Sequence, residues 1–215
     1  VLMSGSAVAI DWAQQHADAI VDAWYPGESG GTAIARVLAG DGDPGGRLPV
    51  TFYRAARDLP PYVSYDMQGR TYRYFKGTPL YPFGYGLSYT TFAYADPVLS
   101  TTELKAGATL KVSAMVRNTG TRAGDEVVEV YLDAPDVPLA PRHALAGFER
   151  VHLMPGESRR VEFELLPRQL STVDAGGNRA VVAGRYRLFI GGGQPGDAPG
   201  VGASLTISGR DTLPR

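Results

Sequence analysis

Apolar and polar positions alternate along residues 96–210, and this period of two predicts β-strands with one buried face. The alternation is clearest in five segments: Leu110, Val112, Ala114 and Val116; Val128, Val130 and Leu132; Val161, Phe163 and Leu165; Tyr186, Leu188 and Ile190; and Ala203, Leu205 and Ile207. Turn sequences separate the segments, namely Asn118-Thr119-Gly120, Met154-Pro155-Gly156-Glu157 and Asp174-Ala175-Gly176-Gly177. Short strands at this spacing predict an antiparallel β-sandwich over residues 96–215, in which Tyr186 is a candidate tyrosine corner.

Residues 1–52 have a different pattern, which predicts a piece of an α/β domain. Val1-Leu2-Met3-Ser4-Gly5 is typical of the end of a buried strand, and a chain that opens inside a strand is expected to be part of something longer. A first helix is predicted where apolar residues recur at i, i+3, i+4 and i+7: Ala17, Ile20, Val21 and Trp24. A second helix is predicted over residues 31–39 with Gly40 as its stop, and residues 48–53 are predicted to be extended.

Residues 53–95 hold 12 of the 21 aromatic residues of the chain, interrupted by many prolines and glycines. Flexible linkers are depleted in aromatic residues. A buried ring covers roughly 150–250 Å² of surface. The segment is therefore predicted to be an ordered connector held by ring burial.

Composition and charge exclude several classes of protein. The 215 residues carry 21 basic and 22 acidic side chains, and this balance argues against a nucleic-acid binder or a membrane-surface protein. No apolar run approaches the roughly 18–20 residues of a membrane helix, and no signal peptide is visible. The absence of cysteine excludes disulfides, thiolate metal sites and a cysteine nucleophile.

Two short motifs resemble functional sites but lack the context that such sites need. Gly27-Glu28-Ser29-Gly30-Gly31 resembles the surroundings of a trypsin-type serine. None of the three histidines, at positions 16, 143 and 152, stands in the context of a matching base, so a turn entering the second helix is favoured. Gly191-Gly192-Gly193-Gln194-Pro195-Gly196 satisfies G-x-G-x-x-G, but its prolines forbid the helix that a dinucleotide site needs, and a hairpin loop is predicted.

A glycosidase needs two opposed carboxylates, and few acidic residues here have suitable neighbours. Asp66 lies beside Tyr65, Arg70 and Tyr72, a group able to hydrogen-bond sugar hydroxyls. An ion pair between Asp66 and Arg70 within the connector is the favoured interpretation. No metal-binding motif is present. The sequence therefore predicts no catalytic, cofactor-binding or metal-binding residue.

Three blocks of sequence together resemble the C-terminal part of a glycoside hydrolase family 3 enzyme. They are Ala23-Trp24-Tyr25-Pro26-Gly27-Glu28-Ser29-Gly30-Gly31 with Asp43-Pro44-Gly45-Gly46-Arg47-Leu48-Pro49-Val50-Thr51; Arg70-Thr71-Tyr72-Arg73-Tyr74-Phe75 with Tyr81-Pro82-Phe83-Gly84-Tyr85-Gly86-Leu87-Ser88-Tyr89; and Val116-Arg117-Asn118-Thr119-Gly120 through Leu145-Ala146-Gly147-Phe148-Glu149. The third block is similar to the fibronectin type III-like domain that closes many of these enzymes. Within the family, residues 70–75 resemble the β-xylosidase branch more than the β-glucosidase branch.

The resemblance implies a retaining, exo-acting β-glycosidase that removes terminal β-linked xylose or glucose from oligosaccharides. It also implies that the nucleophilic Asp and the acid/base Glu lie upstream of this chain, so no catalytic residue is carried over and Glu28 falls in a structural turn. The expected organisation is then the end of an α/β sandwich domain (1–52), the connector (53–95) and a fibronectin type III-like sandwich (96–215). The expected partner is the N-terminal catalytic remainder, and the expected location is the periplasm or the outside of the cell.

One alternative from a different class is a non-catalytic module that binds carbohydrate or protein on the β-sandwich. Such a module would need an exposed aromatic strip. Few rings follow Tyr94, and most of them fall at apolar positions of strands: Tyr131, Phe148, Phe163, Tyr186 and Phe189. Whether Asp66, Arg70 or Tyr72 reach a sugar site is left open by the sequence.

Overall fold

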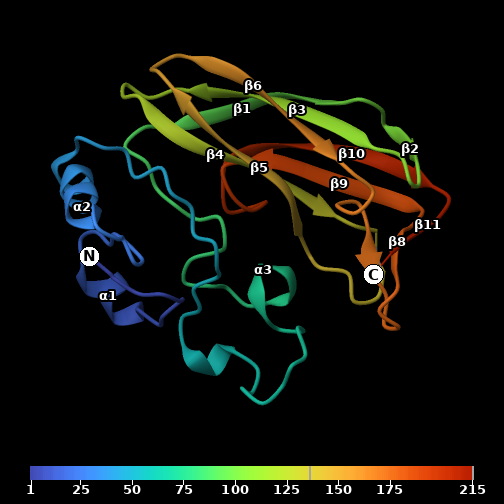
Figure 1. Ribbon diagram of the computed structural model, residues 1–215, viewed down its shortest axis with the longest axis horizontal. Coiled ribbons are helices and arrows are strands. Elements are labelled where there is room, and N and C mark those ends of the chain that lie inside the picture. The colour runs from blue at the N-terminus through green and yellow to red at the C-terminus, as the bar shows by residue number, and fades with distance from the viewer. Residues whose placement is uncertain (136, 215) are drawn as a thin grey trace.

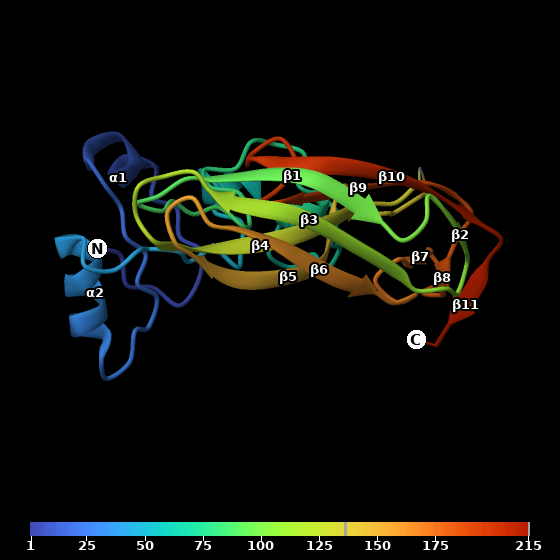
Figure 2. The same ribbon diagram turned by 90° about the horizontal axis from the view of Figure 1, so that it is seen from above.

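Two β-sheets face each other and enclose the main hydrophobic core in the computed structural model, which describes residues 1–135 and 137–214 (Figures 1 and 2). One sheet has the order β1-β3-β6, formed by Phe92–Leu99, Leu110–Asn118 and Ser158–Leu165. The other has the order β2-β10-β9-β4-β5, formed by Glu103–Lys105, Gly200–Ser208, Gly184–Gly191, Gly124–Asp133 and Ala144–Leu153. All neighbours in the two sheets are antiparallel except β2 and β10. The predicted β-sandwich is confirmed.

The predicted alternation accounts for the core of the sandwich. Val112, Val130, Ile190 and Leu205 each expose 2% or less of their surface. Residues two apart along a strand share a face. The polar residues that alternate with these buried positions therefore point away from the core. All five segments that alternate in the sequence lie within strands of the two sheets: β3, β4, β6, β9 and β10.

A small third sheet, β11-β8-β7, closes the end of the sandwich beside the C-terminus (Figure 1). Its strands are Asp211–Leu213, Arg179–Val181 and Thr172–Val173. The hydroxyl of the fully buried Tyr186 in β9 donates a hydrogen bond of 2.9 Å to the carbonyl oxygen of Val182, which lies between β8 and β9. A tyrosine that bonds the backbone a few residues upstream is the arrangement of a tyrosine corner. The prediction for Tyr186 is confirmed.

Replacing Tyr186 by phenylalanine is expected to lower the free energy of unfolding by about 1–2 kcal/mol, because the Val182 carbonyl loses its donor. Tyr65→Phe is the matched control, since the Tyr65 side chain is 98% exposed. Urea unfolding followed by circular dichroism measures both variants. Equal midpoints for the two variants would contradict a structural role of the Tyr186 hydroxyl.

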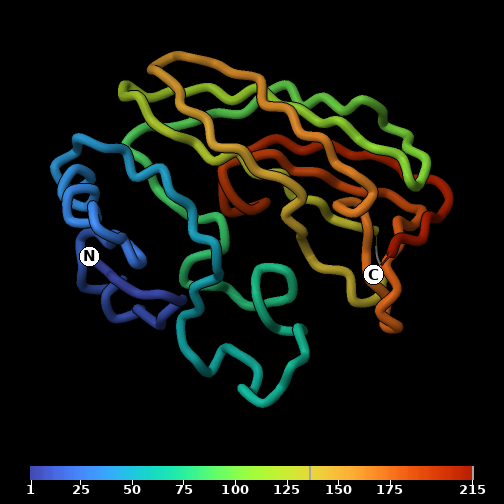
Figure 3. Tube along the Cα trace, in the orientation of Figure 1, coloured from blue at the N-terminus to red at the C-terminus, as the bar shows by residue number. Residues whose placement is uncertain are grey.

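The first part of the chain wraps along one end of the sandwich and contains only short elements (Figure 3). Helix α1 is Asp11–His16 and helix α2 is Gly30–Ala39, followed by Gly40 in the left-handed conformation at φ 81°. The second predicted helix is therefore confirmed within one residue of its start. Phe52 pairs with Tyr81 in an isolated antiparallel bridge, which agrees with the extended segment predicted over residues 48–53.

The helix predicted from Ala17, Ile20, Val21 and Trp24 is wrong. These residues are not helical, and the Leu2 amide donates to the Val21 carbonyl oxygen at 2.8 Å in a parallel bridge. The apolar, β-branched run Ile20-Val21 suits an extended chain, and a run this short does not distinguish helix from strand by periodicity. Trp24 then takes φ 52°, which no right-handed helix accommodates.

Aromatic side chains contact one another along the connector, but most of its rings are half-buried and none is fully buried. Two of its short helical turns are η1, Ala56–Asp58, and α3, Thr71–Tyr74. Rings stack or meet edge to face in pairs such as Tyr72–Phe83, Tyr53–Phe75 and Tyr81–Tyr85. Three rings are exposed: Tyr62 (99%) and Tyr65 (98%) on the loop between η1 and α3, and Tyr89 (44%). Strand β1 already begins at Phe92, within the segment assigned to the connector.

Candidate functional site

The serine and glycine motifs are structural, as the sequence analysis favoured. Ser29 is the N-cap residue of α2, directly after the exposed Glu28 in the turn that enters this helix. The glycines at 191–193 begin the loop between β9 and β10 and are followed by no helix. Among the described residues there is no cluster of three or more potential metal ligands, and no helix has the length and apolar character to cross a membrane.

Asp66 and Arg70 lie on the exposed loop of the connector, and the expected ion pair between their side chains is wrong. The Arg70 guanidinium instead donates to three backbone carbonyl oxygens, those of Asp66 (3.1 Å), Pro61 (3.0 Å) and Ser64 (2.9 Å). The Asp66 carboxylate accepts from the Gln68 amide at 2.9 Å. The carbonyl oxygens of the loop satisfy the guanidinium donors of Arg70 in place of a carboxylate. Arg70 therefore holds the loop in shape.

Tyr72 holds the connector to the sandwich and has no contact with Asp66 among its ring contacts and hydrogen bonds. Its ring stacks on Phe83 with centroids 4.4 Å apart and meets Tyr131 of β4 edge to face. Its hydroxyl oxygen accepts a hydrogen bond from the Leu145 amide of β5 at 3.1 Å. The three residues singled out in the sequence therefore form no single site.

A buried ion pair joins the part of the chain before residue 53 to the β-sandwich. Arg47 bonds the Glu126 carboxylate of β4, and the exposed fractions of the two side chains are 8% and 3%. Tyr94 of β1 donates to the same carboxylate at 2.6 Å. Arg47 also donates to the Gly192 carbonyl oxygen in the β9–β10 loop at 3.2 Å. One arginine thus connects three separate parts of the chain.

A second buried carboxylate lies three residues further along the same strand. Glu129 is 4% exposed and accepts a hydrogen bond of 2.6 Å from the hydroxyl of the fully buried Tyr131. Gly84 of the connector covers this pair, and a Cβ atom there would lie 2.5 Å from the Glu129 carboxylate. The absence of a side chain at Gly84, which also has φ 79°, lets the connector lie directly on the carboxylate.

Burial controls the protonation of both carboxylates. Loss of hydration raises the pKa of Glu126 above the ordinary value, although the charge of Arg47 and the hydrogen bond from Tyr94 oppose the shift. Loss of hydration also raises the pKa of Glu129, where the Tyr131 hydroxyl opposes it. The pKa values of Tyr94 and Tyr131 are raised by burial and by the carboxylates beside them, so both hydroxyls remain donors.

The sequence did not predict the two buried carboxylates, although the position of one of them was a signal. Glu126 stands in phase with Val128 and Val130, which face the core. A charged residue at a core position needs an opposite charge nearby, so an arginine from elsewhere in the chain could have been expected. Glu129 lies on the other face of β4, and its burial depends on the connector, which no local pattern reveals.

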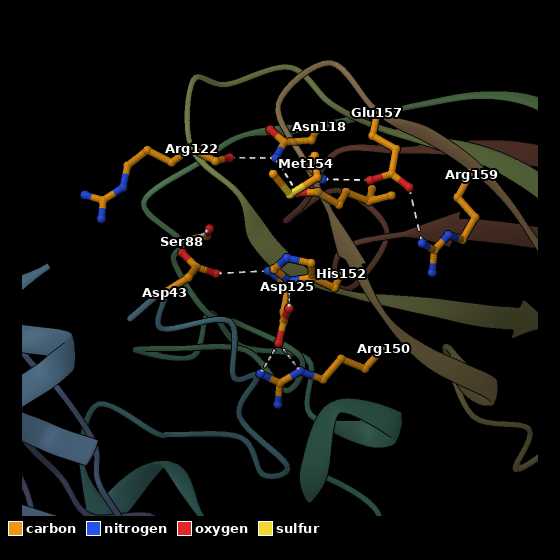
Figure 4. Close-up of polar contacts among 11 residues, drawn as sticks. Asp43, Ser88, Asn118, Arg122, Asp125, Arg150, His152, Met154, Glu157 and Arg159 are labelled. Carbon is orange, nitrogen blue, oxygen red and sulfur yellow. Dashed lines mark hydrogen bonds and ion pairs between the residues drawn. The ribbon is translucent and has the colours of Figure 1, made fainter. Parts of the chain in front are cut away.

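An aspartate network forms a second junction between the two parts of the chain (Figure 4). Asp43 accepts hydrogen bonds from the Ser88 hydroxyl at 2.7 Å, from the Tyr89 amide at 2.8 Å and from the Asp125 amide of β4 at 3.3 Å. Tyr89 in turn donates to the Val37 carbonyl oxygen of α2 at 2.8 Å. The turn after α2 is therefore tied to both the connector and the sandwich.

The Asp125 side chain is the outer part of this network. It accepts from Arg150 at 2.5 and 2.8 Å and contacts His152 Nδ1 at 2.6 Å, both on the neighbouring strand β5 (Figure 4). Partial burial works to raise its pKa, but the hydrogen bonds from His152 and Arg150 prevail and lower it. Asp125 is therefore ionised across the physiological pH range.

Asn118, which ends β3, has every hydrogen-bonding position filled although it is fully buried. Its oxygen accepts from the Thr90 hydroxyl at 2.7 Å and the Gly120 amide at 3.0 Å. Its amide nitrogen donates to the carbonyl oxygens of Arg122 at 2.7 Å and Leu153 at 3.0 Å (Figure 4). The side chain thus fixes the turn Asn118-Thr119-Gly120 against the end of the connector.

These clusters hold parts of the chain together and are unsuited to glycoside hydrolysis. Hydrolysis needs one carboxyl group that protonates the leaving group and a second that attacks or activates water at the sugar. Glu126 and Glu129 are the buried carboxylates of the described residues, and each is engaged by a tyrosine beneath the connector. No residue of this chain is assigned a catalytic role.

Glu129→Gln is expected to remove a pH dependence of stability. A raised pKa in the folded state means that stability is fully present below the ordinary glutamate pKa and is lost as pH rises through the raised value. Wild type should therefore lose stability relative to Glu129→Gln as the pH rises through this window. Urea unfolding at several pH values measures the difference, with the exposed Glu164→Gln as control. Parallel profiles for wild type and Glu129→Gln would contradict the burial of a charge at this position.

The comparisons with known families agree with the geometry. The profile of the glycosyl hydrolase family 3 C-terminal domain matches residues 1–89, and that of the fibronectin type III-like domain matches residues 126–194. Residues 1–89 therefore belong to the glycosyl hydrolase family 3 C-terminal domain, and residues 126–194 belong to a fibronectin type III-like domain.

Relatives of known name match nearly the whole chain. A xylan 1,4-beta-xylosidase of Xylanibacter ruminicola is 44% identical over 87% of this chain and 22% of its own length. A periplasmic beta-glucosidase of Salmonella typhimurium is 39% identical over 89% of this chain and 27% of its own length. The solved beta-glucosidase of Kluyveromyces marxianus in complex with glucose has a TM-score of 0.86 and 32% identity, over 98% of this chain and 27% of that one. The chain thus spans about a quarter of the length of the relatives that it matches.

Proposed function

We propose that this chain is the non-catalytic C-terminal part of a retaining, exo-acting β-glycosidase that removes terminal β-linked xylose or glucose from oligosaccharides. The observation that carries the proposal is the identity of 44% to a xylan 1,4-beta-xylosidase over 87% of the chain. Xylose is favoured over glucose because the same comparison agrees with the β-xylosidase-like sequence at residues 70–75. A periplasmic or secreted location is proposed from the named periplasmic relative.

The role proposed for the chain is to complete the α/β domain and to fix the β-sandwich against it. The buried pair of Arg47 and Glu126 supports this role, since it ties the segment before the connector to β4. The partner would be the catalytic remainder of the same enzyme. Large apolar side chains of the first 40 residues support such a partner, because Trp12, Tyr25 and Leu38 are 72%, 79% and 60% exposed.

Hydrolysis of aryl β-xyloside and aryl β-glucoside tests the proposal. The 215-residue chain alone should hydrolyse neither substrate, whereas the longer gene product that contains it should hydrolyse at least one, with the xyloside preferred. Hydrolysis by the chain alone that survives further purification would contradict a non-catalytic role. A longer gene product that is folded and inactive on both substrates would contradict the glycosidase assignment.

A non-catalytic binding module is a weaker candidate. Among the aromatic residues that follow Tyr94 in the described chain, Phe148 is mostly exposed at 68%, whereas Tyr131 and Tyr186 are fully buried. One exposed ring does not form a strip. Retention of the chain on insoluble xylan or cellulose would revive this candidate.

Hydrogen exchange is expected to be fast over residues 12–40 in the 215-residue chain alone. The two helices there bury little apolar surface, and the Leu2–Asp22 bridge is a single isolated pair. Segments with few buried contacts open at low free energy. Exchange measured by mass spectrometry should show this segment protected only in the longer gene product. Strong protection in the isolated chain would contradict the need for a partner.

A further inference from the structure

A pocket of about 230 Å³ lies between the connector, the start of β5 and the loop between β9 and β10. Its walls include the aromatic side chains Tyr72 and Phe75 and the polar side chains of Thr78, Arg142, His143 and Asp197. Drug-sized ligands occupy pockets of about 300–1,000 Å³, so this pocket suits a smaller molecule. None of the roles described above uses it.

His143 presents an oriented imidazole to this pocket. Its Nδ1 atom lies 2.5 Å from the Asp133 carboxylate, which also pairs with Arg187 at 3.2 Å. A carboxylate accepts a hydrogen bond from the Nδ1–H group and so fixes both the ring and its tautomer. In the part of the chain that the structure describes, Nε2 of His143 has no hydrogen-bond partner. The second ring nitrogen is therefore left to bind a ligand.

The charged groups of the pocket favour a neutral ligand that both donates and accepts hydrogen bonds. Arg142 uses Nη1 to bond the Phe75 carbonyl oxygen at 2.6 Å, which leaves its other guanidinium donors available. The Asp197 carboxylate has no hydrogen bond or ion pair within residues 1–135 and 137–214. An anion would be repelled by Asp197 and a cation by Arg142, whereas sugar hydroxyls satisfy both.

We propose that this pocket binds a single sugar ring, whose hydroxyls bond Arg142, His143 and Asp197 and whose apolar face contacts Tyr72 or Phe75. Aromatic rings suit this task because their faces are apolar and slightly negative, and so attract C–H groups. The choice of xylose and glucose as probes rests on the proposed function; the shape and chemistry of the pocket do not.

The test is a titration of the 215-residue protein with xylose and with glucose, followed by NMR of the histidine rings. The chain has only three histidines, so the His143 signals are easily assigned. At least one sugar should shift the His143 ring signals saturably and leave those of His16 unchanged. The variants His143→Gln and Asp197→Asn should each weaken binding at least tenfold.

His152→Gln is the matched control, because His152 also pairs with an aspartate but lies outside this pocket. It should bind the sugar as wild type does. Asp197 is exposed in a loop, so Asp197→Asn keeps the test valid if His143→Gln fails to fold. No saturable shift, equal binding by wild type and Asp197→Asn, or a saturable His143 shift with sulfate in place of sugar would overturn the proposal. Hydrolysis by the longer gene product would stand in each of these cases.

Discussion

Replacing Arg47 by methionine is expected to lower the free energy of unfolding by about 3–5 kcal/mol, because it breaks a buried ion pair. The substitution leaves Glu126 buried without a cation, and it also removes a donor from the Gly192 carbonyl oxygen. Methionine has a similar length, so lost volume contributes little. Urea unfolding followed by circular dichroism at neutral pH measures the change.

Arg54→Met is the matched control for this prediction. Arg54 pairs with Asp11 at 3.4 Å, but the exposed fractions of the two side chains are 52% and 42%. Exposed pairs contribute about 0–1 kcal/mol, so this variant should unfold almost as wild type does. A loss for Arg47→Met as small as that for Arg54→Met would mean that water reaches Glu126 and that the pair is not a buried link.

Replacing Gly86 by alanine is expected to cost about 3 kcal/mol or more, because the added Cβ atom would overlap the Gly46 carbonyl oxygen. The same Cβ atom would lie 3.0 Å from the Arg47 side chain. A backbone atom yields less readily than a flexible side chain, so the connector must shift away from residues 46–47. The link from Arg47 to Glu126 should weaken with it. Thermal unfolding of the variant gives the size of the effect.

Gly31→Ala is the matched control, because this substitution should not destabilise the protein. A Cβ atom at Gly31 meets no other atom within 4 Å, and the residue lies in helix α2. Alanine favours a helix over glycine by about 1 kcal/mol, so this variant should be unchanged or slightly more stable. Equal losses for Gly31→Ala and Gly86→Ala would show that close backbone packing at Gly86 is not the cause.

The sandwich was predictable from the sequence because each strand shows its buried face locally. Val112 and Ile190 each stand in an alternating run, and the turn at Asn118 marks the end of a strand. Strand β5 was not recognised, since its middle is exposed and its polar residues hide the alternation. The segment containing Ile20 and Val21 was misread for a different reason: the run is short, and its pairing partner Leu2 is distant in sequence.

The links between the parts of the chain could not be predicted, because they depend on contacts between distant residues. Arg47 and Glu126 are 79 residues apart. The core position of Glu126 indicates that it needs a partner, but nothing in the sequence identifies Arg47 as that partner. The expected contact of Asp66 with Arg70 failed because carbonyl groups of the loop compete for the guanidinium. The resemblance to family 3 indicated the order of the parts of the chain but assigned no role to these residues.

We infer that residues 46–53, the connector and the β-sandwich form one cooperative unit, joined at Arg47, Glu126 and Glu129. Native-state hydrogen exchange of the 215-residue protein in low urea tests it most directly, by comparing residues 46–53 and 81–94 with strand β4. The account predicts that all three segments exchange through the same global opening, with equal free energies. Exchange of residues 46–53 and 81–94 at a free energy well below that of β4 would contradict it.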